Sequence, residues 1–169
     1  MMRLIQYILF LLLPFWTRAE EWNMIAIRNL YYKASASKED AEKLKALLES
    51  IFTPNECIKG YIAASYMIEA MHVYNPSTKL SYFMNGKNLL DNAIKNEPGN
   101  IELKFLRICI QTNAPSFLGY NKHIDSDKAF IIATYSVQTD PDLKKRIKEF
   151  MTQSGLCSEE EKKAFNSFY

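Results

Sequence analysis

The sequence predicts an all-α protein of about eight helices arranged in antiparallel hairpins. Apolar residues recur at three- and four-residue steps along most of the chain, which is the spacing of one helix face. Residues that favour helix caps and turns separate these periodic segments, and no alternating apolar and polar run indicates a strand. We expect the hairpins to stack as a solenoid or as a compact helical array.

Residues 1–19 have the layout of a secretory signal peptide. Arg3 precedes an apolar run over residues 4–16, and small side chains follow at the positions that suit cleavage after Ala19. The mature chain would then be residues 20–169, which is the length of one domain with a hydrophobic core. This layout predicts an exported protein of the periplasm or cell envelope.

An uncleaved membrane anchor is the alternative reading of the N-terminal segment. The apolar run is shorter than the roughly 20 residues that a spanning helix needs. Gln6 and Pro14 also interrupt it. We therefore favour cleavage and expect no membrane span in the mature chain.

The mature chain carries no net charge. The whole sequence has 21 Lys and Arg and 19 Asp and Glu, and the predicted signal peptide removes Arg3 and Arg18 but no acid, which leaves 19 of each. Nucleic-acid binding depends on a basic surface that neutralises phosphates. The charge balance therefore excludes nucleic acid as an expected partner.

The first three helices are predicted over residues 20–34, 37–52 and 56–73. Ser37 begins a capping box at the start of the second helix, which should form a hairpin with the first. The third helix has apolar residues on two faces and should be buried on two sides. Its small residues, among them Gly60 and Ala63, should let a neighbouring helix approach closely.

The expected centre of the fold is a hairpin over residues 79–120. Its first helix should end at the turn of residues 97–100, where proline cannot continue the helix. Asn100 can then cap a second helix over residues 101–111, which has almost no polar face. Such a helix must be covered on more than one side.

A long connection, residues 112–124, separates this hairpin from the C-terminal helices. Asp125 or Ser126 is expected to cap a helix that runs to about residue 137. Asp140 should cap the next helix, which has proline at its first position and ends before Gly155. A capping box at residues 158–161 predicts a short final helix.

One hairpin resembles the tetratricopeptide repeat. Gly86, Leu90, Ala93 and Pro98 fall on the spacing of the second helix of that repeat, and Asn100 matches the asparagine that often follows. The early tryptophan of the repeat is absent and the connection before Gly86 is longer than the repeat allows. The resemblance therefore implies a degenerate, TPR-like α-solenoid.

The mature chain also resembles a group of uncharacterised exported helical proteins of Gram-negative bacteria. Residues 27–33 and 113–120 carry this resemblance. It implies a helical fold and an exported location, and it implies no activity.

The connection over residues 113–123 is the candidate partner-binding site. Aromatic side chains there can stack on a partner, and the amides can read a peptide backbone. The candidate residues are Asn113, Phe117, Tyr120, Asn121 and His123. Alternatively, Phe117, Leu118 and Tyr120 fold inward and cover the central helix.

No catalytic, cofactor or metal site is predicted. His123, Ser126 and Asp127 are the residue types of a hydrolase triad, but they are explained more simply as the polar start of a helix. Cys109 should be a small buried side chain. The pairing of the three cysteines, Cys57, Cys109 and Cys157, stays open.

Two functions remain. The first is an exported helical scaffold, not an enzyme, that binds a protein or peptide in the cell envelope through the concave face of its hairpins. The alternative is a small-ligand-binding or enzymatic envelope protein with a pocket under residues 113–123.

Overall fold

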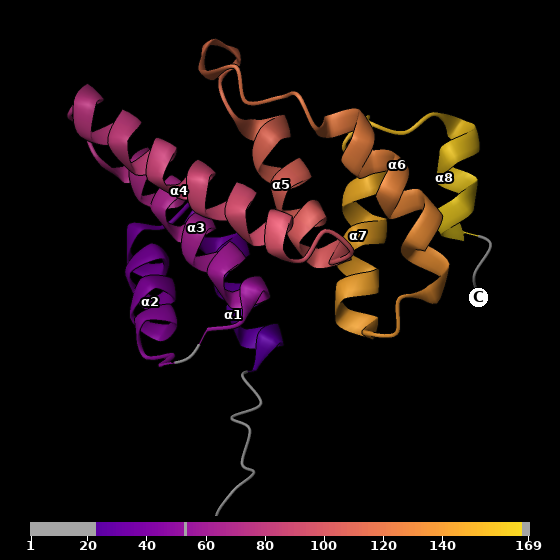
Figure 1. Ribbon diagram of the computed structural model, residues 1–169, viewed down its shortest axis with the longest axis horizontal. Helices are drawn as coiled ribbons and strands as arrows, with labels where there is room; N and C mark the ends of the chain where they lie inside the picture. The colour runs from indigo at the N-terminus through magenta and orange to yellow at the C-terminus, as the bar shows by residue number, and fades with distance from the viewer. Residues whose placement is uncertain (1–22, 53, 167–169) are drawn as a thin grey trace, which may run out of the picture.

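The computed structural model describes residues 23–52 and 54–166, and it confirms an all-α fold (Figure 1). These residues form eight α-helices and no strand. The predicted signal peptide, residues 1–19, lies outside the described residues. The helices are α1 (Met24–Ala34), α2 (Lys38–Glu49), α3 (Glu56–His72), α4 (Pro76–Asn96), α5 (Ile101–Asn113), α6 (Ile124–Thr134), α7 (Pro141–Gln153) and α8 (Glu159–Asn166), with 3-10 turns at Ser116–Leu118 and Tyr135–Val137.

The eight helices form a compact array in which α5 separates two groups. Helices α1 to α4 lie on one side of α5, and α6 to α8 lie on the other (Figure 1). The most extensive helix–helix contact is between α3 and α4, which form a hairpin. Helix α1 packs against α2, and α5 packs against α6. The predicted central hairpin of α4 and α5 exists, but α4 packs mainly on α3.

Helix α5 is the wall between two hydrophobic cores, as its nearly continuous apolar sequence predicts. Leu103 and Leu106 belong to the core that α1 to α4 enclose. Phe105 and Ile108 belong to the core that α6 to α8 enclose. One helix therefore contributes to both cores from opposite faces.

Two glycines allow neighbouring helices to approach α3, as its small residues predict. A Cβ at Gly86 of α4 would lie 2.5 Å from the carbonyl oxygen of Ala63 on α3. A Cβ at Gly60 of α3 would lie 2.4 Å from the end of the Leu103 side chain on α5. Real Cβ atoms do not approach other atoms this closely. The contact at Gly86 depends on glycine because the atom it meets belongs to the backbone, whereas the Leu103 side chain beside Gly60 could shift.

Most predicted caps are confirmed. Asn100 and Asp140 accept backbone N–H groups at the starts of α5 and α7. Ser158 and Glu161 form the reciprocal capping box before α8, with distances of 3.2 and 2.8 Å. These short polar side chains satisfy donors that have no partner within the helix.

Several boundaries differ from the prediction, among them the end of α2, which lies at Glu49 rather than at residue 52. Helix α4 begins at Pro76, three residues early, because Asn75 accepts the N–H groups of Ser77 and Thr78. The N-cap of α6 is His123 rather than Asp125 or Ser126, and the helix closes through the backbone carbonyl of His123. Helix α5 continues for two residues beyond the predicted end at residue 111.

Candidate functional site

The candidate site is an apolar cleft of about 920 Å³ between helices of the first group, α5 and the segment that follows α5. The C-terminal halves of α1 and α3 and the N-terminal half of α4 form most of it. Its lining is mostly apolar and includes Met67 and Met71 of α3. Representative lining residues are Tyr31, Ala64, Met67, Ile68, Phe83, Cys109, Ile110, Ala114, Leu118 and Phe150.

Large apolar side chains at the edge of the cleft remain exposed to solvent. Phe117 is 85% exposed, Met71 59%, Leu80 49% and Tyr32 43%, and all four line the cleft. Scattered exposed apolar residues are ordinary, whereas contiguous exposed apolar patches are less common on soluble proteins. We call these four residues the rim.

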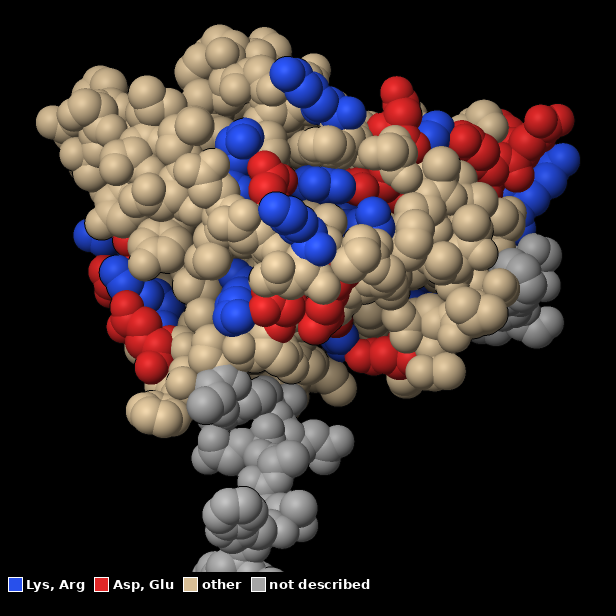
Figure 2. All heavy atoms as spheres, viewed as in Figure 1, with Lys and Arg blue, Asp and Glu red and all other residues tan. Residues whose placement is uncertain are grey.

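Charged groups are scarce around the cleft. Among the described residues that line it, Lys79 is the one charged side chain, and no histidine, aspartate or glutamate is present. Figure 2 shows that acidic and basic side chains gather over the middle, the right and the lower left of the molecule. In that view the surface over the N-terminal half of α4 carries few charges.

The polar groups in the cleft are poorly suited to acid–base chemistry. Burial raises the pKa of Tyr31 and the pKa of the Cys109 thiol well above their ordinary values, so both groups stay protonated at neutral pH. The Asn113 amide nitrogen donates to the backbone carbonyl of Cys109 at 2.8 Å. The arrangement suits binding of an apolar surface rather than proton transfer.

The segment between α5 and α6 forms one wall of the cleft. A 3-10 turn over Ser116–Leu118 ends at Gly119, whose φ of 59° is left-handed and favours glycine. Leu118 packs against the core of α1 to α4, whereas Phe117 is 85% exposed. The segment therefore covers the core and exposes an aromatic ring at the same time.

The structure separates the five predicted partner-binding residues. Asn113 and Phe117 line the cleft. Tyr120 is 4% exposed and packs edge-on against Phe83, with ring centres 5.8 Å apart. Asn121 and His123 are exposed and are not among the lining residues.

The inward packing proposed for this segment holds for Leu118 and Tyr120. It is wrong for Phe117, which is almost fully exposed. The physical reason is the tight turn, which directs successive side chains to different sides. Sequence periodicity does not reveal such a turn.

Outside the cleft, a buried ion-pair cluster joins α1, α5 and α7. Arg28 is 2% exposed and donates to both oxygens of Glu102 at 2.7 and 2.8 Å. It also donates to Asp140 at 2.8 Å and to Asp142 at 2.9 Å. The Tyr61 hydroxyl of α3 donates to Glu102 at 2.8 Å. We call these five residues the Arg28 cluster.

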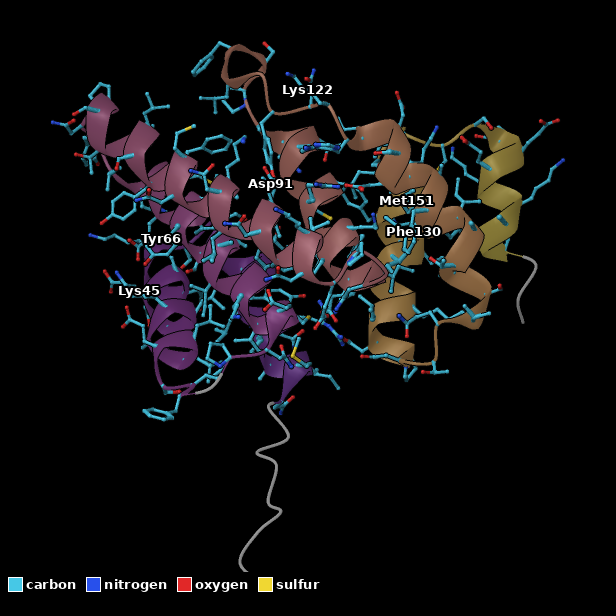
Figure 3. The ribbon with its side chains drawn as sticks, in the orientation of Figure 1. Lys45, Tyr66, Asp91, Lys122, Phe130 and Met151 are labelled. Atoms are coloured by element: carbon cyan, nitrogen blue, oxygen red, sulfur yellow. The ribbon has the colours of Figure 1, made fainter. Side chains whose placement is uncertain are left out.

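A second cluster joins α4, α5 and α6 near Asp91, which Figure 3 labels. Arg107 donates to both oxygens of the fully buried Asp127 at 2.7 and 2.8 Å. It lies 3.5 Å from Asp91, which also accepts from the Tyr120 hydroxyl at 3.1 Å. We call Asp91, Arg107, Tyr120 and Asp127 the Arg107 cluster.

These contacts account for the hydrolase-like residues around position 125. Asp127 is held by Arg107, and the Ser126 hydroxyl donates to the backbone carbonyl of His123 at 3.0 Å. The two side chains thus serve a buried ion pair and a helix start.

The clusters shift the pKa values of their members. Burial alone lowers the pKa of Arg28, but the hydrogen bonds and charges of Glu102, Asp140 and Asp142 outweigh it and raise that pKa. Burial by itself would raise the pKa of Asp140. The hydrogen bonds that its carboxylate accepts from Arg28 and from backbone N–H groups outweigh burial, so the pKa lies below the ordinary value. Both groups therefore stay charged at neutral pH.

The sequence did not predict the Arg28 cluster, the Arg107 cluster or the full set of residues that line the cleft. Nothing in the spacing of Arg28 on α1 or of Arg107 on α5 marks either side chain as buried. A weak signal exists for Arg107, because it interrupts an otherwise apolar segment of α5. A charge in such a segment needs a partner.

The three cysteines are free in this structure, and Cys109 and Cys157 are buried. Cys109 is the small buried side chain that the sequence predicts. No group of three or more histidine, cysteine, aspartate or glutamate side chains within residues 23–52 and 54–166 could hold a metal ion. None of the helices in the described part combines the length and apolarity that crossing a bilayer takes.

No protein-family model, curated protein or solved structure matches this chain.

Proposed function

We propose that this protein is an exported helical scaffold that binds a protein or peptide partner through the apolar cleft. The observation that carries this proposal is the exposed rim, in which Phe117 is 85% and Met71 59% accessible. Interfaces between proteins are rich in aromatic and methionine side chains. Burying such a rim against a partner removes apolar surface from water, at about 25 cal/mol per Å².

The chemistry of the lining supports binding without catalysis. The described residues that line the cleft include neither a histidine nor a carboxylate, and the buried Cys109 thiol has a raised pKa. Methionines such as Met67 and Met71 are flexible and can adapt to the surface of a partner.

The relationship to tetratricopeptide repeats is part of the same proposal. In this chain Gly86 is the small residue of the repeat-like pattern, and a Cβ there would lie 2.5 Å from the carbonyl oxygen of Ala63 on α3. A close helix pair at that position is what the pattern requires. This contact supports a TPR-like hairpin of α3 and α4.

Site-specific photo-crosslinking in intact cells tests the proposed function. A photo-reactive amino acid replaces Phe117 in one variant and Phe52, which is 94% exposed and outside the cleft, in the control. We expect a reproducible adduct with one polypeptide at position 117 and none at position 52. The adduct should disappear when Leu80→Asp places a charge on the rim.

Identical adducts at the two positions, or none at position 117, would contradict the proposal. Exported location is tested separately by sequencing the N-terminus of the protein recovered from cells. A mature chain that starts at Glu20 is expected, and a retained N-terminal segment would remove this part of the proposal.

A small-ligand-binding protein is the second candidate. The cleft volume of about 920 Å³ lies within the range of small-molecule pockets, and residues 113–118 form one of its walls. Native mass spectrometry of protein purified without organic solvent distinguishes the two candidates. A stoichiometric co-purified small molecule that Phe83→Ala abolishes would favour the second.

A further inference from the structure

The size of the exposed rim indicates an occupant larger than the cleft itself. A ligand confined to the interior would contact the deep residues, such as Met67 and Phe83, and would leave Phe117 and Met71 in water. A polypeptide segment that lies across the cleft can contact both the deep residues and the rim. The rim therefore favours a peptide segment over a small molecule.

The secondary structure around the cleft limits the form of that segment. One common way for an extended peptide to bind is to complete its backbone hydrogen bonds at a sheet edge. The described part of this chain has no strand, and the helices that form the cleft use their own backbone groups. The Asn113 amide is already bonded to Cys109. A helical segment already has its backbone hydrogen bonds made internally. It can therefore enter the cleft without leaving its own backbone N–H and C=O groups unpaired.

The charge of the cleft limits the side chains of that helix. Lys79 is exposed, and no ion-pair partner for it exists among the described residues. The N-terminus of α4 is not a competing anion site, because Asn75 already accepts the N–H groups of Ser77 and Thr78. A carboxylate on the occupant would therefore meet the Lys79 ammonium.

We propose that the cleft binds an amphipathic helix of a partner protein, with its apolar face against the rim and an Asp or Glu side chain opposite Lys79. This inference rests on the proposed function and specifies the chemistry of the partner. The apolar face supplies the affinity, and the carboxylate sets the orientation of the helix.

Selection from a displayed library of random 16-residue peptides tests the proposal with the full mature chain as target. We expect the selected peptides to share apolar residues at three- and four-residue steps and one acidic residue at a fixed position. Phe117→Ala should weaken their binding at least about fivefold, the effect of losing a central aromatic contact. Phe52→Ala is the matched control and should leave binding unchanged.

Charge reversal isolates the role of Lys79. Lys79→Glu should weaken the binding of the acidic peptides by about two- to fivefold, which is the effect of one exposed ion pair. The loss of affinity should be larger at low salt. A synthetic peptide with Lys in place of its acidic residue should regain that loss in the Lys79→Glu protein. An acid in the first turn suits the helix dipole, so α4 should stay folded. Lys122→Glu, on an exposed loop outside the cleft, is the control.

The outcomes separate this inference from the proposed function. The inference would be overturned, and the proposed function left standing, by peptides whose binding requires Phe117 but that share no acidic residue at a fixed position. Peptides whose binding is unchanged by Lys79→Glu would have the same consequence. Failure to select any peptide that depends on Phe117 would overturn both. Saturable binding of a fluorescent long-chain fatty acid that displaces the peptides, or a concentration-dependent dimer that buries Phe117, would also overturn the inference.

Discussion

The guanidinium of Arg28 is 2% exposed and is bonded to three carboxylates from α5 and the start of α7. Arg28→Ala should reduce the free energy of unfolding by roughly 3–5 kcal/mol, because it leaves Glu102 buried without its cation. Urea unfolding followed by circular dichroism measures the loss. Lys43→Ala breaks an exposed pair with Glu39 and serves as the control, with no measurable change expected. Equal midpoints for the two variants would show that Arg28 does not stabilise the fold.

The same cluster makes stability depend on pH. The pKa values of Asp140 and Asp142 are lowered in the folded protein, chiefly through hydrogen bonds and charges of Arg28 and Arg146 that outweigh burial. Their contribution is therefore fully present above the unfolded pKa of about 3.9 and is lost as pH falls through the folded values. Urea midpoints measured from pH 6 to pH 2 should fall steeply below about pH 4.

The double variant Asp140→Asn and Asp142→Asn checks the origin of this acid sensitivity. Its stability should be lower at pH 6 and should fall less steeply below pH 4, because two of the titrating groups are gone. An unchanged slope would assign the effect to other carboxylates. No sequence pattern distinguishes Arg28 from an exposed arginine, since burial of a charge depends on partners that lie far away in the chain.

At the scale of helices, the contact of α3 with α4 depends on a missing side chain. Gly86→Ala gains up to about 1 kcal/mol in helix propensity, but its Cβ would lie 2.5 Å from the backbone oxygen of Ala63. We expect a net destabilisation of roughly 1–3 kcal/mol in a urea melt, because a backbone atom cannot move aside cheaply. Gly99→Ala has open space around its Cβ and should not destabilise. A more stable Gly86→Ala protein would mean that the helices separate without cost.

The segment between α5 and α6 combines two roles in adjacent positions. Tyr120→Ala should cost about 3 kcal/mol or more, because it empties a buried site beside Phe83 and removes a hydrogen bond to Asp91. Phe117→Ala should change the thermal midpoint little, because the ring is 85% exposed. Differential scanning calorimetry of both variants checks this contrast. The opposite order would mean that Tyr120 belongs to the surface and Phe117 to the core.

Local sequence predicts the elements better than their ends. Caps such as Asn100 and Asp140 are correctly identified, because a short polar side chain before an apolar periodic run has one common structural use. The start of α6 is not, because three polar residues in a row offer several equivalent caps and the backbone of His123 closes the helix instead. For the same reason the sequence could place Phe117 and Tyr120 near a site but could not predict that Phe117 is exposed and Tyr120 buried.

At the scale of the whole molecule, α5 couples the two halves. Leu106 faces the core of α1 to α4 and is 2% exposed, while Ile108 faces the core of α6 to α8 and is fully buried. Leu106→Ala and Ile108→Ala should each cost roughly 2–5 kcal/mol. Hydrogen exchange should show both halves losing protection together in either variant. Loss confined to one half would show that the two cores unfold independently.

The sequence predicts the central position of α5 because an apolar helix needs cover on several sides. It cannot predict the cleft, because the lining residues extend from Tyr31 to Phe150 and no local pattern joins them. Asn113 and Phe117 could be selected because their segment fits no helix, whereas Tyr32, Met71 and Leu80 lie on helices where they look like ordinary apolar positions. Identifying these three as a rim requires the three-dimensional arrangement.

The Arg28 cluster has a consequence for how the newly made chain acquires its structure. In the sequence, Glu102 lies 74 residues after Arg28, and Asp140 lies 112 residues after it. At about 5–20 residues per second, synthesis of the latter interval takes roughly 6–22 seconds. During that time the first helix is available to the ribosome and to chaperones with its guanidinium still hydrated. The Arg28 cluster thus forms only after Asp140 and Asp142, which lie within the last third of the chain, have been synthesised.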